Sequence, residues 1–219
     1  MSAFPDSPSI LKGGLVLLDP VTSTVTRVIV LQYNPDSLSR TLQAQGAAVD
    51  ASGGDRSEVL RLKGPPIETL KLEAEIDATD QLETNDQAVL RSGIFPQLAA
   101  LETILYPPLA TILSNHALAS AGVLEIIPME APLTLFVWSA QRIVPVRITE
   151  FSVVEDTFDE RLNPIRAKVT LGMRVLSVDD LGFAHPGGTV FLGHLRRKEG
   201  LAARSKSGEL KSLGIGAIR

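Results

Sequence analysis

The candidates for metal binding in this sequence are its three histidines and one acidic segment. His116, His185 and His194 are widely separated and show no HxH or HxxxH spacing, which would place two imidazoles on one face. The acidic residues between positions 155 and 160 lack the glycine-punctuated ligand loop that calcium sites show. We therefore predict that the chain has no metal site. The histidines are expected to be surface or capping residues, and the acidic segment a solvated turn.

Motifs for nucleophilic catalysis and for phosphate binding are missing from the sequence. The chain contains no cysteine, which removes thiol catalysis, thiolate metal ligands and disulfides. It has no G-x-G-x-x-G, no G-x-x-x-x-G-K-[ST] and no G-x-S-x-G stretch, so neither a phosphate cradle nor a nucleophile elbow is supported. A Ser/His/Asp triad drawn from distant segments would leave no such signature. We predict no catalytic residue, no cofactor and no enzymatic activity.

A row of basic side chains on one face of a strand is the positive functional signal. Between Ile165 and Val175, apolar residues alternate without a fault with a second set that includes Arg166, Lys168 and Arg174. A period of two is the signature of a strand with one buried face, so the three cations share the other face. Two interpretations stay open: the row is the solvated side of a sheet, or it lines a pore or a partner.

The strand that carries this row is the second arm of one long β-hairpin, over residues 144–177. Asp159, Asn163 and Pro164 favour a turn between the arms. The first arm changes phase near Thr149, which predicts a β-bulge. The resulting register places three pairs opposite each other: Phe151 with Leu171 and Val153 with Val169 in the core, and Asp156 with Arg166 as an exposed ion pair of small energetic weight.

The rest of the chain predicts further strands and two helices around this hairpin. Strands are expected over residues 10–20, 25–33, 38–42, 58–62, 70–76, 123–127 and 133–138. The segment 25–33 is apolar on both faces, which predicts a central strand sandwiched between layers. A helix is expected after Gly93, with Pro96 in its first turn, and a second one over residues 111–121. Small and polar residues over 45–56 predict a mobile loop.

This pattern indicates a mainly β (β+α) fold in three parts. Residues 1–9 are expected to be a flexible N-terminal arm, residues 10–182 the β domain, and residues 183–219 a basic C-terminal helix and tail. On that helix, Val190, Phe191, His194, Leu195 and Leu201 fit one side of an amphipathic helix, after a turn or linker formed by the stretch GFAHPGG.

Charge is spread unevenly along the chain. The formal net charge is −4, yet residues 194–219 hold seven Lys or Arg against two Asp or Glu, and the remainder holds fourteen against twenty-three. A basic tail on an acidic body fits docking to an acidic partner or to a neighbouring copy. Without interleaved aromatic residues, nucleic-acid binding is not expected. No apolar run approaches the ~20 residues of a membrane span and no signal peptide is visible, so we expect a cytoplasmic protein without direct membrane insertion.

Four stretches, taken together, resemble the tube-type proteins of contractile phage-tail-like injection systems. They are GGLVLLDP with VIVLQYNPDSLSRTLQ, then IFPQLAALETILYPP, then LEIIPMEAPLTLFVW, and finally RITEFSVVEDTFDERLNPIRAKVTLGMRVL. The likeness is greatest to the tube initiator, the adaptor that joins the tube to the spike in the baseplate. It covers most of residues 10–204, because HPGG followed by a basic helix is also similar to members of that family.

The resemblance implies an antiparallel β-sandwich or barrel with a packed helix, assembling as a ring of six. Long hairpins of neighbouring subunits would join edge to edge around a central channel, which pairs otherwise exposed strand edges. The implied partners are copies of the chain itself, the inner tube protein, the spike protein and baseplate components, in a particle assembled in the cytoplasm. A C-terminal LysM module, present in some relatives, is not visible here.

Two groups of residues are candidates for these contacts. The lumen and subunit contacts are assigned to Arg147, Glu150, Asp156, Arg166, Lys168 and Arg174. Docking to the surrounding parts is assigned to Arg196, Arg197 and Lys198. The nearest alternative is the main inner tube polymer. The alternative from another class is a small-ligand-binding β-barrel module or hydrolase, which would need an enclosed pocket with convergent polar groups.

Overall fold

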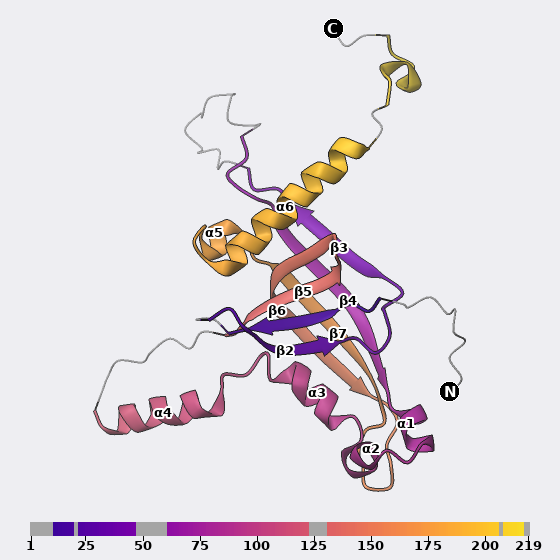
Figure 1. Ribbon diagram of the computed structural model, residues 1–219, viewed down its shortest axis with the longest axis vertical. Helices are drawn as coiled ribbons and strands as arrows, with labels where there is room; N and C mark the ends of the chain where they lie inside the picture. The colour runs from indigo at the N-terminus through magenta and orange to yellow at the C-terminus, as the bar shows by residue number, and fades with distance from the viewer. Residues whose placement is uncertain (1–10, 20–21, 47–60, 123–130, 206–207, 217–219) are drawn as a thin grey trace.

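Seven β-strands of the chain form one antiparallel sheet, shown with its helices in Figure 1. The computed structural model describes residues 11–19, 22–46, 61–122, 131–205 and 208–216. The strands, in the spatial order β2-β1-β5-β6-β7-β4-β3, are β1 (Gly14–Leu18), β2 (Val25–Val30), β3 (Leu38–Gln43), β4 (Ile67–Asp77), β5 (Leu133–Ser139), β6 (Arg142–Glu155) and β7 (Arg166–Val175). The expected class, mainly antiparallel β with packed helices, is confirmed.

Six α-helices accompany the sheet in the described residues. They are α1 (Thr79–Glu83), α2 (Gln87–Ser92), α3 (Phe95–Glu102), α4 (Leu109–Ser120), α5 (Val178–Leu181) and α6 (Pro186–Arg204), followed by the short 3-10 turn η2 (Leu210–Leu213). The two helices expected in the middle of the chain are confirmed as α3 and α4, and Pro96 lies in the first turn of α3. The short helices α1 and α2 were not predicted.

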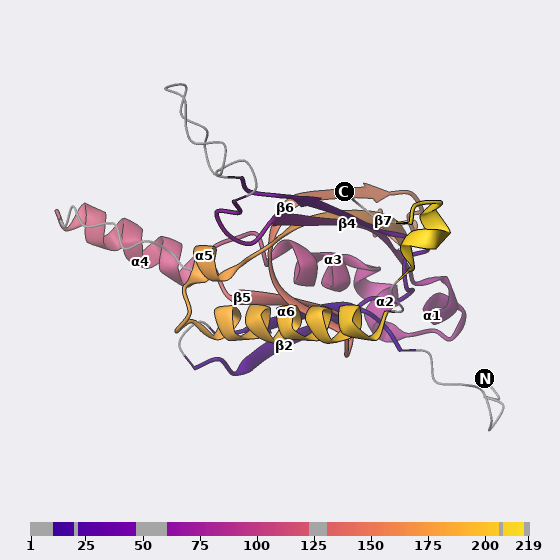
Figure 2. The same ribbon diagram turned by 90° about the horizontal axis from the view of Figure 1, so that it is seen from above.

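Strand β6 divides the sheet into two layers. Its first residues pair with β5 as far as Val146, and from Val146 to Glu155 it pairs with β7. We call β2, β1 and β5 the small layer, and β6, β7, β4 and β3 the large layer. Figure 2 shows the large layer on one side of α3, and β5 and β2 of the small layer on the other side together with α6. One long strand thus belongs to both layers and fixes how they face each other.

The core lies between the two layers and is built by strict alternation. On β4 every second residue is buried, and on β7 all five odd-numbered residues from Ala167 to Val175 are at most 4% exposed. Leu98 and Leu101 of α3 belong to the same buried cluster as Leu15 of the small layer. Each such fully buried side chain stabilises the fold by about 1.5 to 3 kcal/mol, so the period-two pattern determines which face of each strand is inside.

The hairpin of β6 and β7 has the predicted register. Phe151 lies opposite Leu171, Val153 lies opposite Val169, and the ladder shifts between Ile148 and Glu150, which confirms the bulge. The turn is held by the carboxylate of Asp159, which accepts hydrogen bonds from the backbone N–H groups of Arg161 and Asn163, both at 2.8 Å.

The predicted ion pair between Asp156 and Arg166 is wrong. The two residues do face each other, since the Asp156 N–H donates to the Arg166 carbonyl at 3.1 Å. The Arg166 guanidinium, however, donates to the carboxylate of Asp77 on the other neighbouring strand, at 3.0 and 3.1 Å. A side chain on a central strand has neighbours on two sides, and the sequence pattern revealed only one of them.

Strand β2 is the second correction, because it forms an edge of the sheet and not its centre. Its only partner strand is β1, and Val25, Val28 and Val30 are 60%, 56% and 57% exposed. A strand that is apolar on both faces is expected to be covered on both, but the pattern does not show whether its own chain covers it. One face of β2 is not covered by the described residues.

Helix α6 begins earlier than predicted. The stretch expected to be a turn or linker already contains its first turn, where Pro186 follows the N-cap His185, whose Nδ1 accepts a hydrogen bond from the Gly187 N–H at 3.0 Å. The helix packs against the sheet through Val190 and Phe191. Residues 1–9, most of the loop over 45–56, most of the strand over 58–62 and the strand over 123–127 lie outside the described residues.

Replacing Gly93 by alanine is expected to lower the free energy of unfolding by about 2 to 4 kcal/mol, because backbone strain and a steric clash add up. Gly93 ends α2 with φ of +55°, and a Cβ would lie 2.1 Å from the Pro164 carbonyl oxygen, at the base of the hairpin turn. Gly182 is the matched control, since its φ is +80° with open space around it. Urea unfolding of both variants should show the smaller loss for Gly182→Ala; equal losses would contradict the clash.

Candidate functional site

The large layer presents one uncovered face, which we call the polar face. Its other side packs on the core, so the intervening residues of three strands point away from it. In register across the sheet, the polar face carries Lys71, Glu73, Glu75 and Asp77 of β4, Arg166, Lys168, Thr170, Gly172 and Arg174 of β7, and Arg147, Glu150, Ser152 and Val154 of β6, with Asp156 just beyond β6. All six candidates for lumen and subunit contacts therefore lie together on this face.

The polar face is balanced in charge and is not a basic row. Three acidic residues of β4, namely Glu73, Glu75 and Asp77, run beside the cations of β7. The sequence predicted a strand over residues 70–76 but not that its acidic residues lie next to Lys168. This pairing could not be predicted, because β4 and β7 are distant in the chain and no local sequence pattern indicates that they pair.

Most of the cations on the polar face have carboxylate partners within the chain. Arg166 pairs with Asp77 at 3.0 Å and with Glu75 at 3.7 Å. Hydrogen bonds from Thr79, and then the contact with Arg166, hold the pKa of Asp77 below its ordinary value. Arg174 donates at 2.7 Å to Asp180, whose other oxygen caps the start of α5. These side chains remain partly accessible to water, so each pair contributes about 1 kcal/mol.

A glycine lets an ion pair cross an intervening strand. Lys71 of β4 contacts both carboxylate oxygens of Glu150 of β6, at 3.0 and 3.1 Å. Strand β7 lies between them, and its residue at that level is Gly172. A Cβ on Gly172 would lie 2.8 Å from the Cβ of Glu150. The missing side chain therefore leaves the space in which lysine and glutamate meet.

Both edges of the large layer are open in the described part of the chain. Beyond Val146, β6 pairs only with β7, and β3 pairs only with β4. Because the N–H of Asp156 points to β7, strand alternation turns the backbone groups of Phe151, Val153 and Glu155 outward. On β3, alternation followed from β4 likewise directs the backbone groups of Leu38, Arg40 and Leu42 outward.

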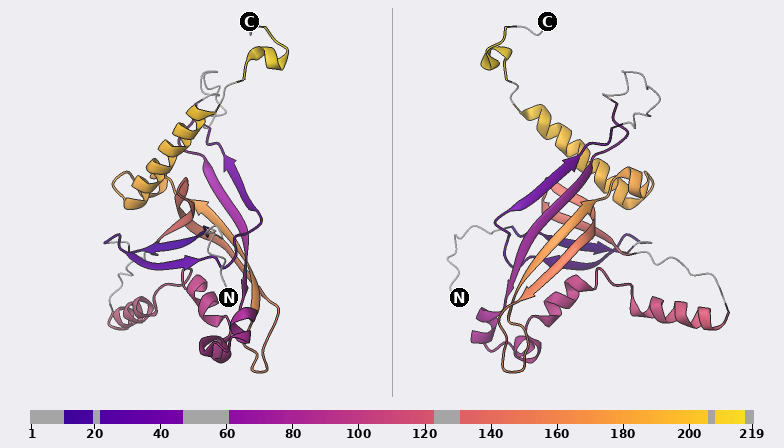
Figure 3. Two further views of the ribbon diagram at one scale, coloured as in Figure 1. Left: turned by 45° about the vertical axis from the view of Figure 1, so that its right-hand side comes forward. Right: turned by 180° about the vertical axis from the view of Figure 1, so that it is seen from behind.

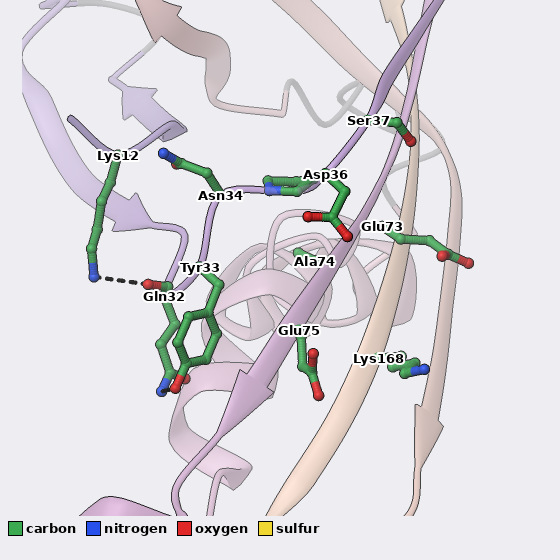
Figure 4. A pocket seen from close by; sticks show the side chains of 11 residues that line it. Lys12, Gln32, Tyr33, Asn34, Asp36, Ser37, Glu73, Ala74, Glu75 and Lys168 are labelled. Atoms are coloured by element: carbon green, nitrogen blue, oxygen red, sulfur yellow. Dashed lines mark hydrogen bonds between the residues drawn. The ribbon is translucent and has the colours of Figure 1, made fainter. Parts of the chain in front are cut away.

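A hollow of about 790 Å³ marks where β3 stops short of the end of β4, as Figure 4 shows. Beyond the pair of Leu38 with Leu72, the backbone groups of Glu73 and Glu75 face this space. At Asp77 the side chain of Gln32 takes the place of a strand: its Oε1 accepts from the Asp77 N–H at 2.9 Å, and its Nε2 donates to the Asp77 carbonyl. The hollow is therefore the part of the β4 edge that β3 does not cover.

The hollow is lined mainly by polar and charged side chains. Among them are the carboxylates of Asp36 and Glu73 and the amines of Lys12 and Lys168. Lys12 donates to the Gln32 carbonyl at 2.8 Å (Figure 4). No described group of three or more His, Asp or Glu residues could hold a metal ion.

The docking candidates on α6 differ in their surroundings. Arg196 is exposed and Arg197 is half-buried. Lys198 is used within the chain, since its Nζ donates at 2.9 Å to Glu68, a carboxylate of a residue only 5% exposed, which Arg40 approaches to 3.6 Å. Lys198 therefore clamps α6 to the start of β4.

One histidine departs from the predicted surface or capping role. His116 is exposed and His185 is a helix cap, as expected. His194 is 4% exposed, and its Nδ1 has no hydrogen-bond partner. Burial, and then the nearby charge of Lys198, lower its pKa. The sequence did place His194 on the packed side of the helix, and that part of the prediction is correct.

Comparisons with known proteins add little. No family model matches the chain, and no curated protein is similar to it. Eight solved chains match, among them one from the tail of an empty GTA particle with C6 symmetry: it is 14% identical, the match covers 74% of this chain and 90% of that one, and the TM-score is 0.29. A TM-score of 0.29 is too low to establish a shared fold. Separately, no described helix is long and apolar enough to cross a membrane.

Replacing Lys198 by alanine is expected to lower the free energy of unfolding by about 1 to 3 kcal/mol, because the buried carboxylate of Glu68 loses its closest partner. Arg196→Ala, two residues away on an exposed position, is the matched control and should cost about 0.5 kcal/mol or less. Chemical denaturation followed by circular dichroism measures both. Equal small losses would show that Lys198 does not clamp the helix.

Stability should also fall as the solution becomes more acidic than the ordinary histidine pKa of 6.5. Because the folded-state pKa of His194 is lowered, the unfolded chain binds the proton more readily. The contribution is fully present above 6.5 and is lost as the pH falls through the folded-state pKa. When the free energy of unfolding is measured from pH 8 downward, this decrease should be missing in His194→Gln and present in the control His116→Gln. An unchanged step in His194→Gln would contradict the assignment.

Proposed function

We propose that this chain is a structural subunit of a contractile phage-tail-like injection system. In this proposal it forms a hexameric ring of the inner tube and acts as the tube initiator that joins tube and spike. The proposal rests on the sequence resemblance described above and on one structural observation, the two open edges of the large layer. It assigns no enzymatic activity to the chain.

The open edges have the polarity that a closed ring needs. The large layer has four strands that alternate in direction, so its two edge strands, β6 and β3, run antiparallel to each other. When β6 of one copy meets β3 of the next, the antiparallel pattern continues across the boundary. A contact between two different surfaces that repeats by rotation forms a ring where the rotation closes and an open filament where it does not, and this polarity permits the ring.

The free part of β6 is poorly protected against pairing. Residues Arg147 to Glu155 read RITEFSVVE, rich in β-branched and aromatic residues and without proline or lysine. Soluble proteins blunt long edge strands with charges, prolines or bulges, or they cover them. Here the bulge after Ile148 affects only the beginning of the segment. A pairing strand from a neighbouring copy would satisfy the remaining backbone groups.

Ring closure would turn the polar face toward a central channel. The opposite side of the large layer carries the small layer, α3 and α6, and is therefore the bulkier side. In a ring of wedge-shaped subunits the bulkier side occupies the larger circumference, outside. The channel wall would then consist largely of ion pairs. Lys168 is an exception, since it forms no ion pair among the described residues.

Attachment to spike and baseplate is assigned to the exposed part of α6. Arg196 and Arg204 are exposed and available for an acidic partner, while Arg197 is half-buried and Lys198 is engaged with Glu68. The division into an N-terminal arm, a β domain and a basic C-terminal part stays a prediction. The main inner tube polymer is the nearest alternative, because it would use the same ring. Long stacks formed by the protein alone would favour it, and single rings would favour the initiator.

Replacing Glu155 by proline is expected to abolish ring formation while leaving the subunit folded. The N–H of Glu155 points to the open edge, and proline removes it without touching the ladder to β7. Glu155→Ala keeps the N–H and is the matched control. Native mass spectrometry should show rings for the wild type and for Glu155→Ala, and monomers for Glu155→Pro.

The neighbouring position separates edge effects from damage to the hairpin. Val154→Pro removes an N–H that faces β7, so it should destabilise the subunit itself by about 3 kcal/mol or more. Circular dichroism and thermal unfolding would record this difference. A wild-type protein that stays monomeric at every concentration, or rings that survive Glu155→Pro, would overturn the proposal.

A further inference from the structure

The two open edges of the large layer expose alternate residues, and these residues limit how two copies can pair. The right-hand view of Figure 3 shows the large layer from behind, with β3 at one of its edges and β6 at the other. The residues with outward backbone groups are Phe151, Val153 and Glu155 on β6 and Leu38, Arg40 and Leu42 on β3. In an antiparallel ladder, residues of one such set lie directly opposite residues of the other. The pairing can therefore shift only in steps of two residues.

The side chains of both outward sets lie on the same side of the large layer. Val153 is opposite Val169 and Arg40 is opposite Leu70, and both of these partners are buried in the core. Residues that face each other across an antiparallel ladder share one face of the sheet. When β6 of one copy pairs with β3 of the next, the core side of one layer therefore continues into the core side of its neighbour. The opposite parity would have joined the core side to the polar face.

Each outward set contains one charged residue, and the two charges have opposite sign. Glu155 on β6 is exposed and forms no ion pair among the described residues. Arg40 on β3 approaches Glu68 to 3.6 Å, but Lys198 is the closer partner of that carboxylate, at 2.9 Å. A cation and an anion therefore lie on the two edges that the ring would join.

The charges favour one register over the next. The register that places Arg40 opposite Glu155 also places Leu42 opposite Val153, so an ion pair is followed by an apolar pair. When the strands are displaced by two residues, Arg40 meets Val153 and Glu155 meets Leu38. Both charges then lie against apolar side chains.

The offset between neighbouring copies agrees with a closed barrel. Across the large layer, Arg40 is level with Leu70 of β4, and Glu155 is level with Ile76, six residues further along. Six copies of four strands with this offset give a strand tilt of about 45°, and the register displaced by two residues gives about 35°, both in the range of closed barrels. Displacement by four residues gives only about 20° and places Glu155 opposite Asp36, a like charge.

We propose that the ring is held in one register, with Arg40 of one copy opposite Glu155 of the next. This inference rests on the proposed ring and adds the residues that determine how far one copy is shifted along its neighbour. An exposed ion pair contributes little free energy. Its role is to exclude the registers in which either charge meets an apolar or a like-charged side chain.

Disulfide cross-linking tests the register, since the chain has no cysteine. A chain carrying Leu42→Cys and Val153→Cys is expected to form covalently linked oligomers on oxidation with copper phenanthroline. The two positions are on opposite edges of a four-strand layer, at least about 14 Å apart, so they cannot link within one copy. Leu42→Cys with Phe151→Cys is the matched control for the register displaced by two residues. It keeps both charges and should give at least about tenfold less linked oligomer.

Charge reversal is a second test that needs no cysteine. Glu155→Lys places two cations opposite each other and should raise the protein concentration required for ring formation by at least about tenfold. Arg40→Gln in the same chain removes the repulsion and should restore the rings. Glu160→Lys makes the same change of charge beyond the end of β6 and should leave the rings intact. Native mass spectrometry over a range of protein concentrations measures all four chains.

The outcomes distinguish the register from the ring itself. A wild-type protein that stays monomeric overturns the proposed ring, and the register with it. Wild-type rings that link through Cys positions 42 and 151 and not through 42 and 153 overturn the register and leave the ring in place. The register is also wrong if Arg40→Gln fails to restore rings in Glu155→Lys.

Discussion

The structure depends on the fact that a β-strand offers hydrogen-bonding groups on two sides, and that β6 finds partners for only part of one side. Its first third joins β5, its second part joins β7, and beyond Val146 the groups opposite β7 have no strand partner in the described part of the chain. The first part of β6 connects the two layers, and the second part extends past the end of β5 to build the long hairpin with β7. The open edge therefore arises because β6 continues where β5 has ended.

This constraint explains why the local pattern predicted the hairpin so well. The alternation on β7, the bulge beside Glu150 and the turn stabilised by Asp159 are all encoded within about 35 neighbouring residues. Short-range periodicity and turn chemistry determine such a unit before any distant contact forms. The alternation on β4 and the proline in α3 are equally local, and those elements were predicted for the same reason.

Contacts between distant segments were not predictable in this way. Arg166 was assigned to Asp156 because the hairpin register places them opposite each other, whereas the guanidinium pairs with Asp77 on β4. Lys198, on the same helix as the buried His194, likewise pairs with Glu68, 130 positions away. Likewise, the apolar faces of β2 showed that cover was needed, but the number of helices above the small layer is a property of the whole fold.

The charge pattern of the polar face follows from the same long-range pairing and alters what that face can do. A row containing only Arg166, Lys168 and Arg174 would attract anions and repel cations. Pairing β7 with β4 places acidic residues beside it, and Gly172 lets Lys71 reach Glu150 across it. The five cations listed on the face are then matched in number by five carboxylates of the same face, and three of the cations form ion pairs within the subunit. A face of nearly zero net charge attracts neither anions nor cations over distances beyond the screening length. Long-range pairing between strands, rather than the charge of one strand, therefore determines the electrostatic character of this face.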